Sequence, residues 1–168
     1  MKALITGAGS GIGRDMARYL SKKGIEIYAV GRNRERLENL KNELDCKVYM
    51  CDLADRNAVM KLYEELKYEN INILINNAGF GAFGRFENLS LETELELIDT
   101  NITALHILTK LFYKDFMQRN SGYILNVASS AAFMAGPLLS SYYASKNYVL
   151  RLTEAIYEET RRKHKNVS

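Results

Sequence analysis

The chain has 168 residues, which fits one domain over residues 1–168, and its hydrophobic fraction of 47% is enough for a substantial core. Its formal net charge of +3 is small. The most basic run, Arg161-Arg162-Lys163-His164-Lys165, ends a predicted helix, where cations complement the helix dipole, and no aromatic residue interleaves it. We therefore expect no nucleic-acid partner.

Membrane and metal sites are not expected either. The first predicted strand starts at Lys2, which leaves no room for a signal peptide, and no apolar run approaches the roughly 20 residues that span a bilayer. Cys46 and Cys51 flank one short predicted strand and have neither the number nor the spacing of a disulfide framework or a zinc site. We expect a soluble, cytoplasmic protein with no metal and two buried, reduced thiols.

Short apolar runs alternate with longer helical patterns along the whole chain. The pattern predicts strands at residues 2–5, 26–30, 47–50, 73–76 and 123–127, and helices at 11–23, 34–44, 55–67, 91–119 and 142–165. Apolar strands separated by helices indicate a parallel sheet with right-handed crossovers and helices on both faces. The predicted fold class is α/β, a doubly wound, Rossmann-like sheet. Gly24 is expected to end the first helix.

A glycine-rich turn joins the first predicted strand to the first helix, with the sequence Thr6-Gly7-Ala8-Gly9-Ser10-Gly11-Ile12-Gly13. Glycines at 7, 11 and 13 would let a pyrophosphate approach the backbone, and the free amides and dipole of the helix start attract that anion. The spacing is Gly-x-x-x-Gly-x-Gly rather than the common Gly-x-Gly-x-x-Gly. The alternative is a plain strand-to-helix turn.

The end of the second predicted strand bears on the choice of cofactor. An NAD-selective site places a carboxylate there for the adenosine ribose hydroxyls, whereas this chain has Gly31 and Arg32. An arginine fork suits the 2′-phosphate of NADP, with Arg34 or Arg14 able to assist. The sequence thus favours NADP(H) over NAD(H). The alternative is that Arg32 simply starts a solvated helix.

Two further polar residues stand out in the order of the chain. Asp52, followed by Leu53 at the end of the third predicted strand, could accept a hydrogen bond from the adenine amino group, and a capping or turn role is compatible with this. Asn101 lies inside the long helix predicted over residues 91–119, where asparagine is a poor helix former. Its side chain or a local kink is therefore expected to have a use.

A proton donor is predicted on the last helix. Tyr142 and Lys146 are four residues apart and project from one helix face. A phenol with a pKa near 10 is a poor acid-base catalyst at neutral pH, but an adjacent ammonium favours the phenolate. Ser129, on the loop after the fifth predicted strand, can donate a hydrogen bond to a substrate carbonyl. Taken singly, each residue could serve only packing, the surface or a loop.

Together these residues resemble the short-chain dehydrogenase/reductase family. The ordered set is Thr6-Gly7-x-x-x-Gly11-Ile12-Gly13, Asp52-Leu53, Asn76-Asn77-Ala78-Gly79, Asn101, Asn126 to Ser129, and Tyr142-x-x-x-Lys146, and it spans nearly the whole chain. The resemblance implies that Tyr142 is the general acid/base and that Lys146 also binds the nicotinamide ribose. It further implies that Ser129 orients the carbonyl and that Asn101 supports a water-mediated proton relay.

The resemblance also decides between neighbours, because it selects Tyr142 over Tyr143 and Ser129 over Ser130. It implies that the segment from Asn76 to Gly79 stabilises the sheet and lines the cofactor cleft. The expected cofactor-binding residues are Thr6, Gly7, Gly9, Ser10, Gly11, Ile12, Gly13, Arg32, Asp52, Leu53, Asn77, Ala78, Gly79, Tyr142 and Lys146.

Family members usually continue with another strand, a substrate-covering helical segment and a last strand. This chain resembles a form shortened at the C-terminus, in which residues 165–168 start the missing strand. We expect most of the cofactor site, little of the substrate pocket, and an uncovered sheet edge that is a liability for aggregation. The resemblance also implies a homodimer or homotetramer formed by the two long helices.

The expected function is that of an NADP(H)-dependent oxidoreductase, a carbonyl reductase acting on a carbonyl or secondary alcohol. The near-apolar stretch from Ala131 to Leu139 suggests a hydrophobic substrate. The alternative is a non-catalytic nucleotide-binding or interaction protein that results from the shortened C-terminus.

Overall fold

The computed structural model describes residues 1–163 and 165–168, so that His164 of the basic run lies outside the described residues. The strands are β1 (Lys2–Thr6), β2 (Glu26–Gly31), β3 (Lys47–Met50), β4 (Ile73–Asn76) and β5 (Tyr123–Asn126). The α-helices are α1 (Gly11–Lys22), α2 (Arg34–Leu44), α3 (Arg56–Leu66), α4 (Leu91–Ile98), α5 (Leu105–Arg119) and α6 (Ser140–Arg162). A π-helix, η1 (Asp99–Ala104), separates α4 from α5, and a 3₁₀ turn, η2 (Ser130–Phe133), precedes α6.

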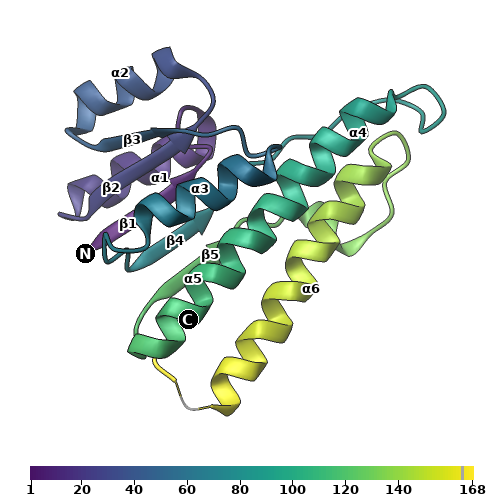
Figure 1. Ribbon diagram of the computed structural model, residues 1–168. Helices are drawn as coiled ribbons and strands as arrows, with labels where there is room; N and C mark the ends of the chain where they lie inside the picture. The colour runs from purple at the N-terminus through teal and green to yellow at the C-terminus, as the bar shows by residue number, and fades with distance from the viewer. Residues whose placement is uncertain (164) are drawn as a thin grey trace.

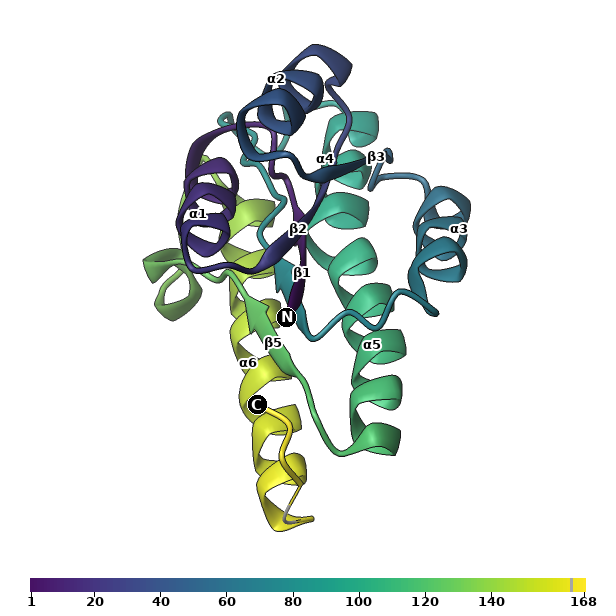
Figure 2. The same cartoon turned by 90° about the vertical axis from the view of Figure 1, so that its left-hand side faces the viewer.

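The five strands form one parallel sheet in the order β3-β2-β1-β4-β5. Helices α1 and α3 lie on opposite sides of this sheet (Figure 2), and α5 and α6 run side by side (Figure 1). The predicted doubly wound α/β fold is confirmed. Because the chain moves outward from β1 to β3 and then returns to place β4 on the other side of β1, the strand order reverses between β1 and β4, where open α/β sheets bind ligands.

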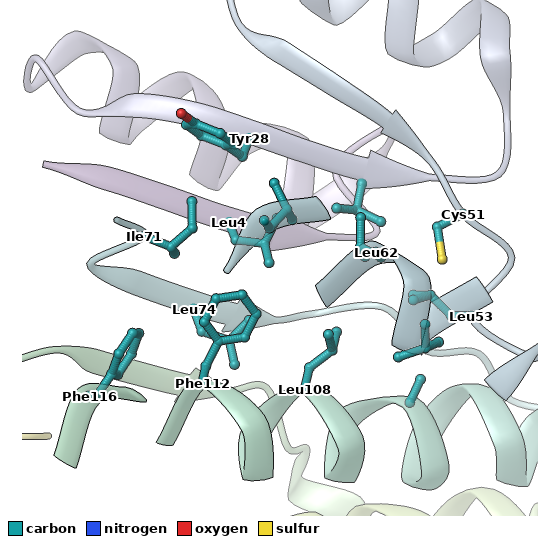
Figure 3. Packing of buried hydrophobic residues seen from close by; sticks show 14 of the residues in the cluster. Leu4, Tyr28, Cys51, Leu53, Leu62, Ile71, Leu74, Leu108, Phe112 and Phe116 are labelled. Carbon is teal, nitrogen blue, oxygen red and sulfur yellow. The ribbon is translucent and has the colours of Figure 1, made fainter. Parts of the chain in front are cut away.

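Alternating residues of the central strands pack into two separate hydrophobic cores, one on each face of the sheet. Ala3 and Ile5 of β1 pack with α1 and α2, whereas Leu4, between them, packs toward α3 and α5. Figure 3 shows Leu4 and Leu74 of the sheet against Phe112 of α5. All of these side chains are almost fully buried, which fits strands covered on both faces.

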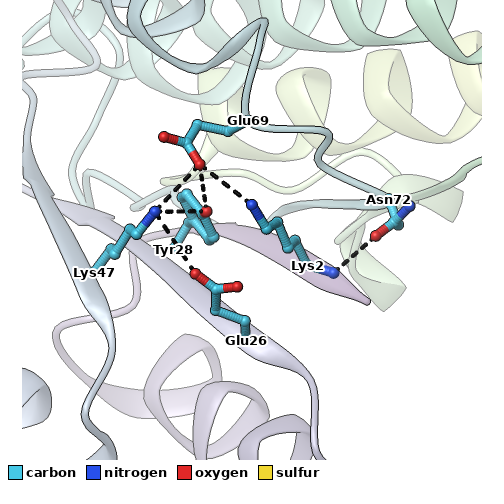
Figure 4. A network of polar contacts seen from close by, with 6 residues as sticks. All are labelled: Lys2, Glu26, Tyr28, Lys47, Glu69 and Asn72. Carbon is cyan, nitrogen blue, oxygen red and sulfur yellow. Dashed lines mark hydrogen bonds and ion pairs between the residues drawn. The ribbon is translucent and has the colours of Figure 1, made fainter.

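A polar network joins the amino-terminal ends of three strands (Figure 4). The Tyr28 hydroxyl donates to Glu69 Oε2 at 2.6 Å, and the ammonium groups of Lys47 and Lys2 lie 3.2 and 3.3 Å from the same oxygen. These three donors lower the pKa of Glu69 to about 2, with the Tyr28 hydrogen bond contributing most. The network lies at the opposite end of the sheet from the carboxyl ends of the strands.

The prediction of one continuous helix over residues 91–119 was wrong. The helix expected over residues 91–119 is interrupted by η1 at Asn101, in agreement with the irregularity that asparagine indicated there. The last helix begins at Ser140 and ends at Arg162, rather than covering 142–165. Gly24 ends α1 as expected, with a φ of 76° and with the Ile25 amide donating to the Leu20 carbonyl.

The far edge of β5 contacts the end of the chain. Val167 forms an isolated parallel bridge with Gly122, and the Ser168 amide donates to the Gly122 carbonyl at 3.1 Å. The strand start expected at 165–168 is therefore paired beside β5. A cavity of about 270 Å³ next to it lies between α5, α6 and β5, and none of the expected site residues lines it.

Candidate functional site

A cleft of about 1020 Å³ lies at the carboxyl ends of the strands. Its walls come from the turn after β1, the ends of β2 and β3, the loops after β4 and β5, and the start of α6. Most of the expected site residues line it, namely Gly7, Gly9, Ser10, Gly11, Ile12, Arg32, Asp52, Leu53, Asn77, Ala78, Gly79, Ser129, Tyr142 and Lys146. Thr6 and Gly13, which were expected to bind the cofactor, and Asn101, which was expected to support a proton relay, are not among its lining residues.

The amino terminus of α1 opens into this cleft. Its N-cap residue, Ser10, makes no side-chain capping hydrogen bond, whereas Asn33, Asp55 and Ser90 cap α2, α3 and α4 with their side chains. Gly11 has a φ of 52°, and no atom lies within 4 Å of the position that a side chain would take. Uncommitted amides beside open space at a helix start suit a pyrophosphate group.

Thr6 and Gly13 stabilise the glycine-rich turn without lining the cleft. The amides of Asn77 and Ala78 donate to Thr6 Oγ1 at 3.0 and 3.1 Å, which ties the loop after β4 to the end of β1. A Cβ atom on Gly13 would lie 2.4 Å from Asn77 Nδ2 and 2.5 Å from the Gly7 carbonyl oxygen. Only glycine therefore allows the helix start to approach the turn this closely.

The arginines that line the cleft are not all the ones that the sequence predicted. Arg32 lines the cleft, and its partner at 2.6 Å is Glu96 on α4. Arg36, rather than Arg34 or Arg14, is the second arginine in the lining. The helix α2 starts at Arg34, and of its residues only Arg36 and Leu37 line the cleft.

Asp52 follows β3 and has the turn role that the sequence left open. Its Oδ1 accepts a hydrogen bond from the Ala54 amide at 3.0 Å, which makes it a turn residue. The residue that caps α3 is Asp55, whose side chain accepts from the Asn57 amide. Asp52 also lines the cleft, next to Leu53.

Tyr142 and Lys146 lie together on the first turns of α6. The Lys146 ammonium is 5.9 Å from the centroid of the Tyr142 ring and donates to the Val127 carbonyl at 2.8 Å. Lys146 is only 6% exposed, and this burial lowers the pKa of its ammonium. The Val127 carbonyl thus fixes the position of a buried cation beside the phenol.

Asn101 holds the loop after β4 against α6. Its Oδ1 accepts from the Phe80 amide at 3.0 Å, and its Nδ2 donates to the Phe80 carbonyl at 2.9 Å and to Ser145 Oγ at 3.1 Å. Asn101 is 1% exposed, so its side chain supports the cleft without lining it. A π-helix places this side chain, and such insertions are frequent at functional sites.

Ser129 lies at the loop after β5 and lines the cleft. It is the N-cap of η2, where its Oγ accepts from the Ala131 amide at 3.1 Å. Since that bond uses the oxygen as an acceptor, the hydroxyl hydrogen stays able to donate. Ser129 can therefore polarise a carbonyl oxygen in the cleft.

The sequence analysis did not predict that Ser145, Arg36 and Thr100 would lie at the cleft or support it. Ser145 is fully buried and links Asn101 to α6, and its Oγ also donates to the Tyr142 carbonyl at 2.7 Å. Arg36 and Thr100 line the cleft. The place of Arg36 in the first turn of the helix that follows Arg32 could have indicated it, but nothing in the sequence distinguishes Ser145 from other serines.

Metal and membrane features are absent from the part of the chain that the structure describes. No three His, Cys, Asp or Glu side chains there come close enough together to bind a metal ion. No helix among the same residues has both the length and the apolar character that crossing a membrane requires. Cys46 and Cys51 are both buried and free.

The sequence matches the family model described as short chain dehydrogenase over residues 1–168. The chain belongs to the short-chain dehydrogenases. These enzymes are oxidoreductases, and human 17-beta-hydroxysteroid dehydrogenase type 3 is 34% identical to this chain over 170 aligned residues. The alignment covers 96% of this chain and 54% of the human protein, so this short-chain dehydrogenase spans about half the length of that relative.

Two solved structures similar to this chain contain different cofactors. A metagenomic short-chain oxidoreductase in complex with NADP has a TM-score of 0.92 and 27% identity, covering 100% of this chain and 80% of that one. A 4-hydroxyisoleucine dehydrogenase complexed with NADH has a TM-score of 0.88 and 31% identity, covering 96% and 68%. Structural neighbours of this fold thus bind NAD(P)(H), without a common preference for one form.

Proposed function

We propose that this short-chain dehydrogenase interconverts a carbonyl and a secondary alcohol with NADP(H). The observation that carries this function is that Tyr142, Lys146 and Ser129 line the same cleft as the uncapped start of α1. When bound, the nicotinamide would supply the hydride for reduction or accept it in the reverse reaction. The dehydrogenase names of the relatives favour this function over a non-catalytic nucleotide-binding protein.

The residues of the cleft fit the cofactor. The free amides at Gly11 and Ile12 suit its pyrophosphate, and Asp52 suits its adenine amino group. Arg32 and Arg36 suit a 2′-phosphate, which supports the preference for NADP(H). Lys146 is also proposed to hold the nicotinamide ribose, as in the family.

Each catalytic group has one proposed task in carbonyl reduction. Ser129 donates a hydrogen bond to the substrate oxygen, and Tyr142 transfers its phenolic proton to that oxygen as the carbon gains a hydride. Lys146 stabilises the phenolate that remains, until a proton returns. Asn101 holds the loop after β4 against α6 and is proposed to support that proton return. In the oxidation direction, the phenolate takes the proton from the alcohol.

Exposed apolar side chains on two segments next to the cleft favour an apolar substrate. Phe83, Phe133 and Met134 are 74%, 70% and 62% exposed. Their two loops are joined by the Gly84 amide, which donates to the Leu138 carbonyl at 2.8 Å, and Gly81 of the first loop lies against the Tyr142 ring. We propose a bulky hydrophobic ketone or alcohol as substrate, in keeping with the hydroxysteroid named for the human relative.

We also propose that the protein forms a homo-oligomer and is cytoplasmic. Exposed apolar residues on α4 and α6, among them Leu91, Leu95 and Tyr157, support a homo-oligomer. Two free, buried cysteines support a reducing, cytoplasmic setting.

The test combines binding with turnover. Titration with NADPH and NADH, followed by cofactor fluorescence, should give saturable binding with NADPH preferred. A panel of apolar ketones and polar sugars should then show NADPH oxidation with the ketones only. The Tyr142→Phe variant should lose turnover about 10²-fold or more and keep NADPH binding.

Tyr143→Phe is the matched control, because Tyr143 is the neighbouring phenol and packs against Gly136 instead of lining the cleft. Its turnover should stay within about threefold of the parent. Unchanged turnover in Tyr142→Phe would contradict the assigned acid-base role. Absence of binding to either nucleotide would contradict the cofactor assignment as a whole.

A further inference from the structure

The arginine proposed for the 2′-phosphate already has an anionic partner. Arg32 Nη1 lies 2.6 Å from Glu96 Oε1, and the two side chains are 68% and 40% exposed. Arg32 directly follows β2, whereas Glu96 is on α4, 64 residues later in the chain. Arg32 lines the cleft and Glu96 does not, so Glu96 reaches the cleft only through the guanidinium.

We propose that Glu96 determines how strongly the site prefers NADPH to NADH, by competing with the 2′-phosphate for Arg32. This inference rests on the cofactor assignment made above. The carboxylate neutralises the guanidinium and repels a phosphate that carries a charge near −2 at neutral pH. A ribose hydroxyl carries no charge, and its binding does not require Arg32 to leave Glu96. The carboxylate therefore weakens NADPH binding and leaves NADH binding almost unaffected.

The rest of the cleft offers the phosphate one further arginine. Arg36 is the other arginine in the lining, so one guanidinium is available to the phosphate while the other is shared with Glu96. The pair is exposed, and ion pairs of this kind are weak and sensitive to salt. Glu96 is thus a positioning residue that tunes selectivity, and it does not block NADPH.

Glu96→Gln is the direct test, because glutamine keeps an oxygen that can accept from Arg32 and removes the charge. Glu92→Gln is the matched control, since Glu92 is exposed one turn earlier on the same helix and loses the same charge. Dissociation constants for NADPH and NADH are measured by fluorescence titration at low and high salt. The expected result for Glu96→Gln is about two- to fivefold tighter NADPH binding, equivalent to ~0.4–1 kcal/mol, with NADH unchanged.

The gain should shrink at high salt and vanish in an Arg32→Ala background, which a merely structural role of Glu96 would not produce. Glu92→Gln should leave the ratio of the two dissociation constants as in the parent. Equal changes for both nucleotides, or weaker NADPH binding in Glu96→Gln, would overturn this inference alone. Failure of the parent protein to bind either nucleotide would overturn the proposed function and this inference with it.

Discussion

Asn101 Nδ2 donates a hydrogen bond to Ser145 Oγ at 3.1 Å, and this bond connects η1 to the residue that precedes Lys146. Ser145 Oγ in turn donates to the Tyr142 carbonyl at 2.7 Å. The side chain of Asn101 also clamps both backbone groups of Phe80. One amide therefore positions the loop after β4 and the two proposed catalytic residues of α6.

Replacing Asn101 by alanine should impair folding and turnover together. The change leaves the Phe80 amide and carbonyl without their partners in a partly buried setting, which costs about 1–3 kcal/mol in the free energy of unfolding. Ser145→Ala is the matched comparison, because it leaves both Phe80 bonds in place, and it should cost only about 1 kcal/mol. Urea unfolding measures both values, and an equal loss for the two variants would argue against the clamp.

Gly13→Ala should destabilise the protein, although alanine normally favours a helix by about 1 kcal/mol over glycine. The new Cβ would meet the Gly7 carbonyl oxygen at 2.5 Å, and that backbone has little room to move. Overpacking of this kind costs about 1–3 kcal/mol, and the shifted turn should also weaken NADPH binding.

The control for that variant is Gly31→Ala, where the nearest atom, a Leu37 methyl, lies at an ordinary contact distance of 3.5 Å. Thermal unfolding should show a clear drop for Gly13→Ala and a much smaller change for Gly31→Ala. A Gly13→Ala protein as stable as the parent would show that the turn can relax.

The Glu69 network should make stability depend on pH in the acid range. Its carboxyl pKa is lowered from 4.5 to about 2 in the folded protein, so the stabilisation is fully present above 4.5 and is lost as the pH falls toward 2. Glu69→Gln should lower the melting temperature at pH 7 and flatten its change between pH 5 and pH 3. Glu65→Gln, whose carboxylate is 3.9 Å from Lys61 on the surface of α3, should keep the parent's pH profile.

Arg36→Ala should reduce the preference for NADPH, because Arg36 lines the cleft near Arg32. Loss of one charge-assisted contact to a phosphate is expected to weaken NADPH binding about tenfold, with NADH less affected. Arg34→Ala provides the control, since Arg34 begins the same helix and does not line the cleft. Parallel titrations decide the point, and an effect of Arg34→Ala as large as that of Arg36→Ala would restore the sequence-based assignment.

The sequence was enough to predict the strands, the order of the motifs and the family, because each depends on local patterns. The apolar period marked all five strands, and asparagine at position 101 indicated an irregular helix. The partners of Arg32 and of Lys146 were not predictable, since Glu96 and the Val127 carbonyl reach them only through tertiary packing. The same holds for Arg36, whose inward direction depends on where α2 begins relative to the cleft.

The π-helix η1 gives this region one residue more than a regular α-helix would have. Deleting one residue between Asp99 and Ala104 would let α4 and α5 join as one regular α-helix. Leu108, Phe112 and Phe116 would then keep their places in the core, whereas Asn101 would lose the backbone position from which it bonds to Phe80 and Ser145. The number of residues in this segment is therefore tied to the cleft and not to the packing of α5.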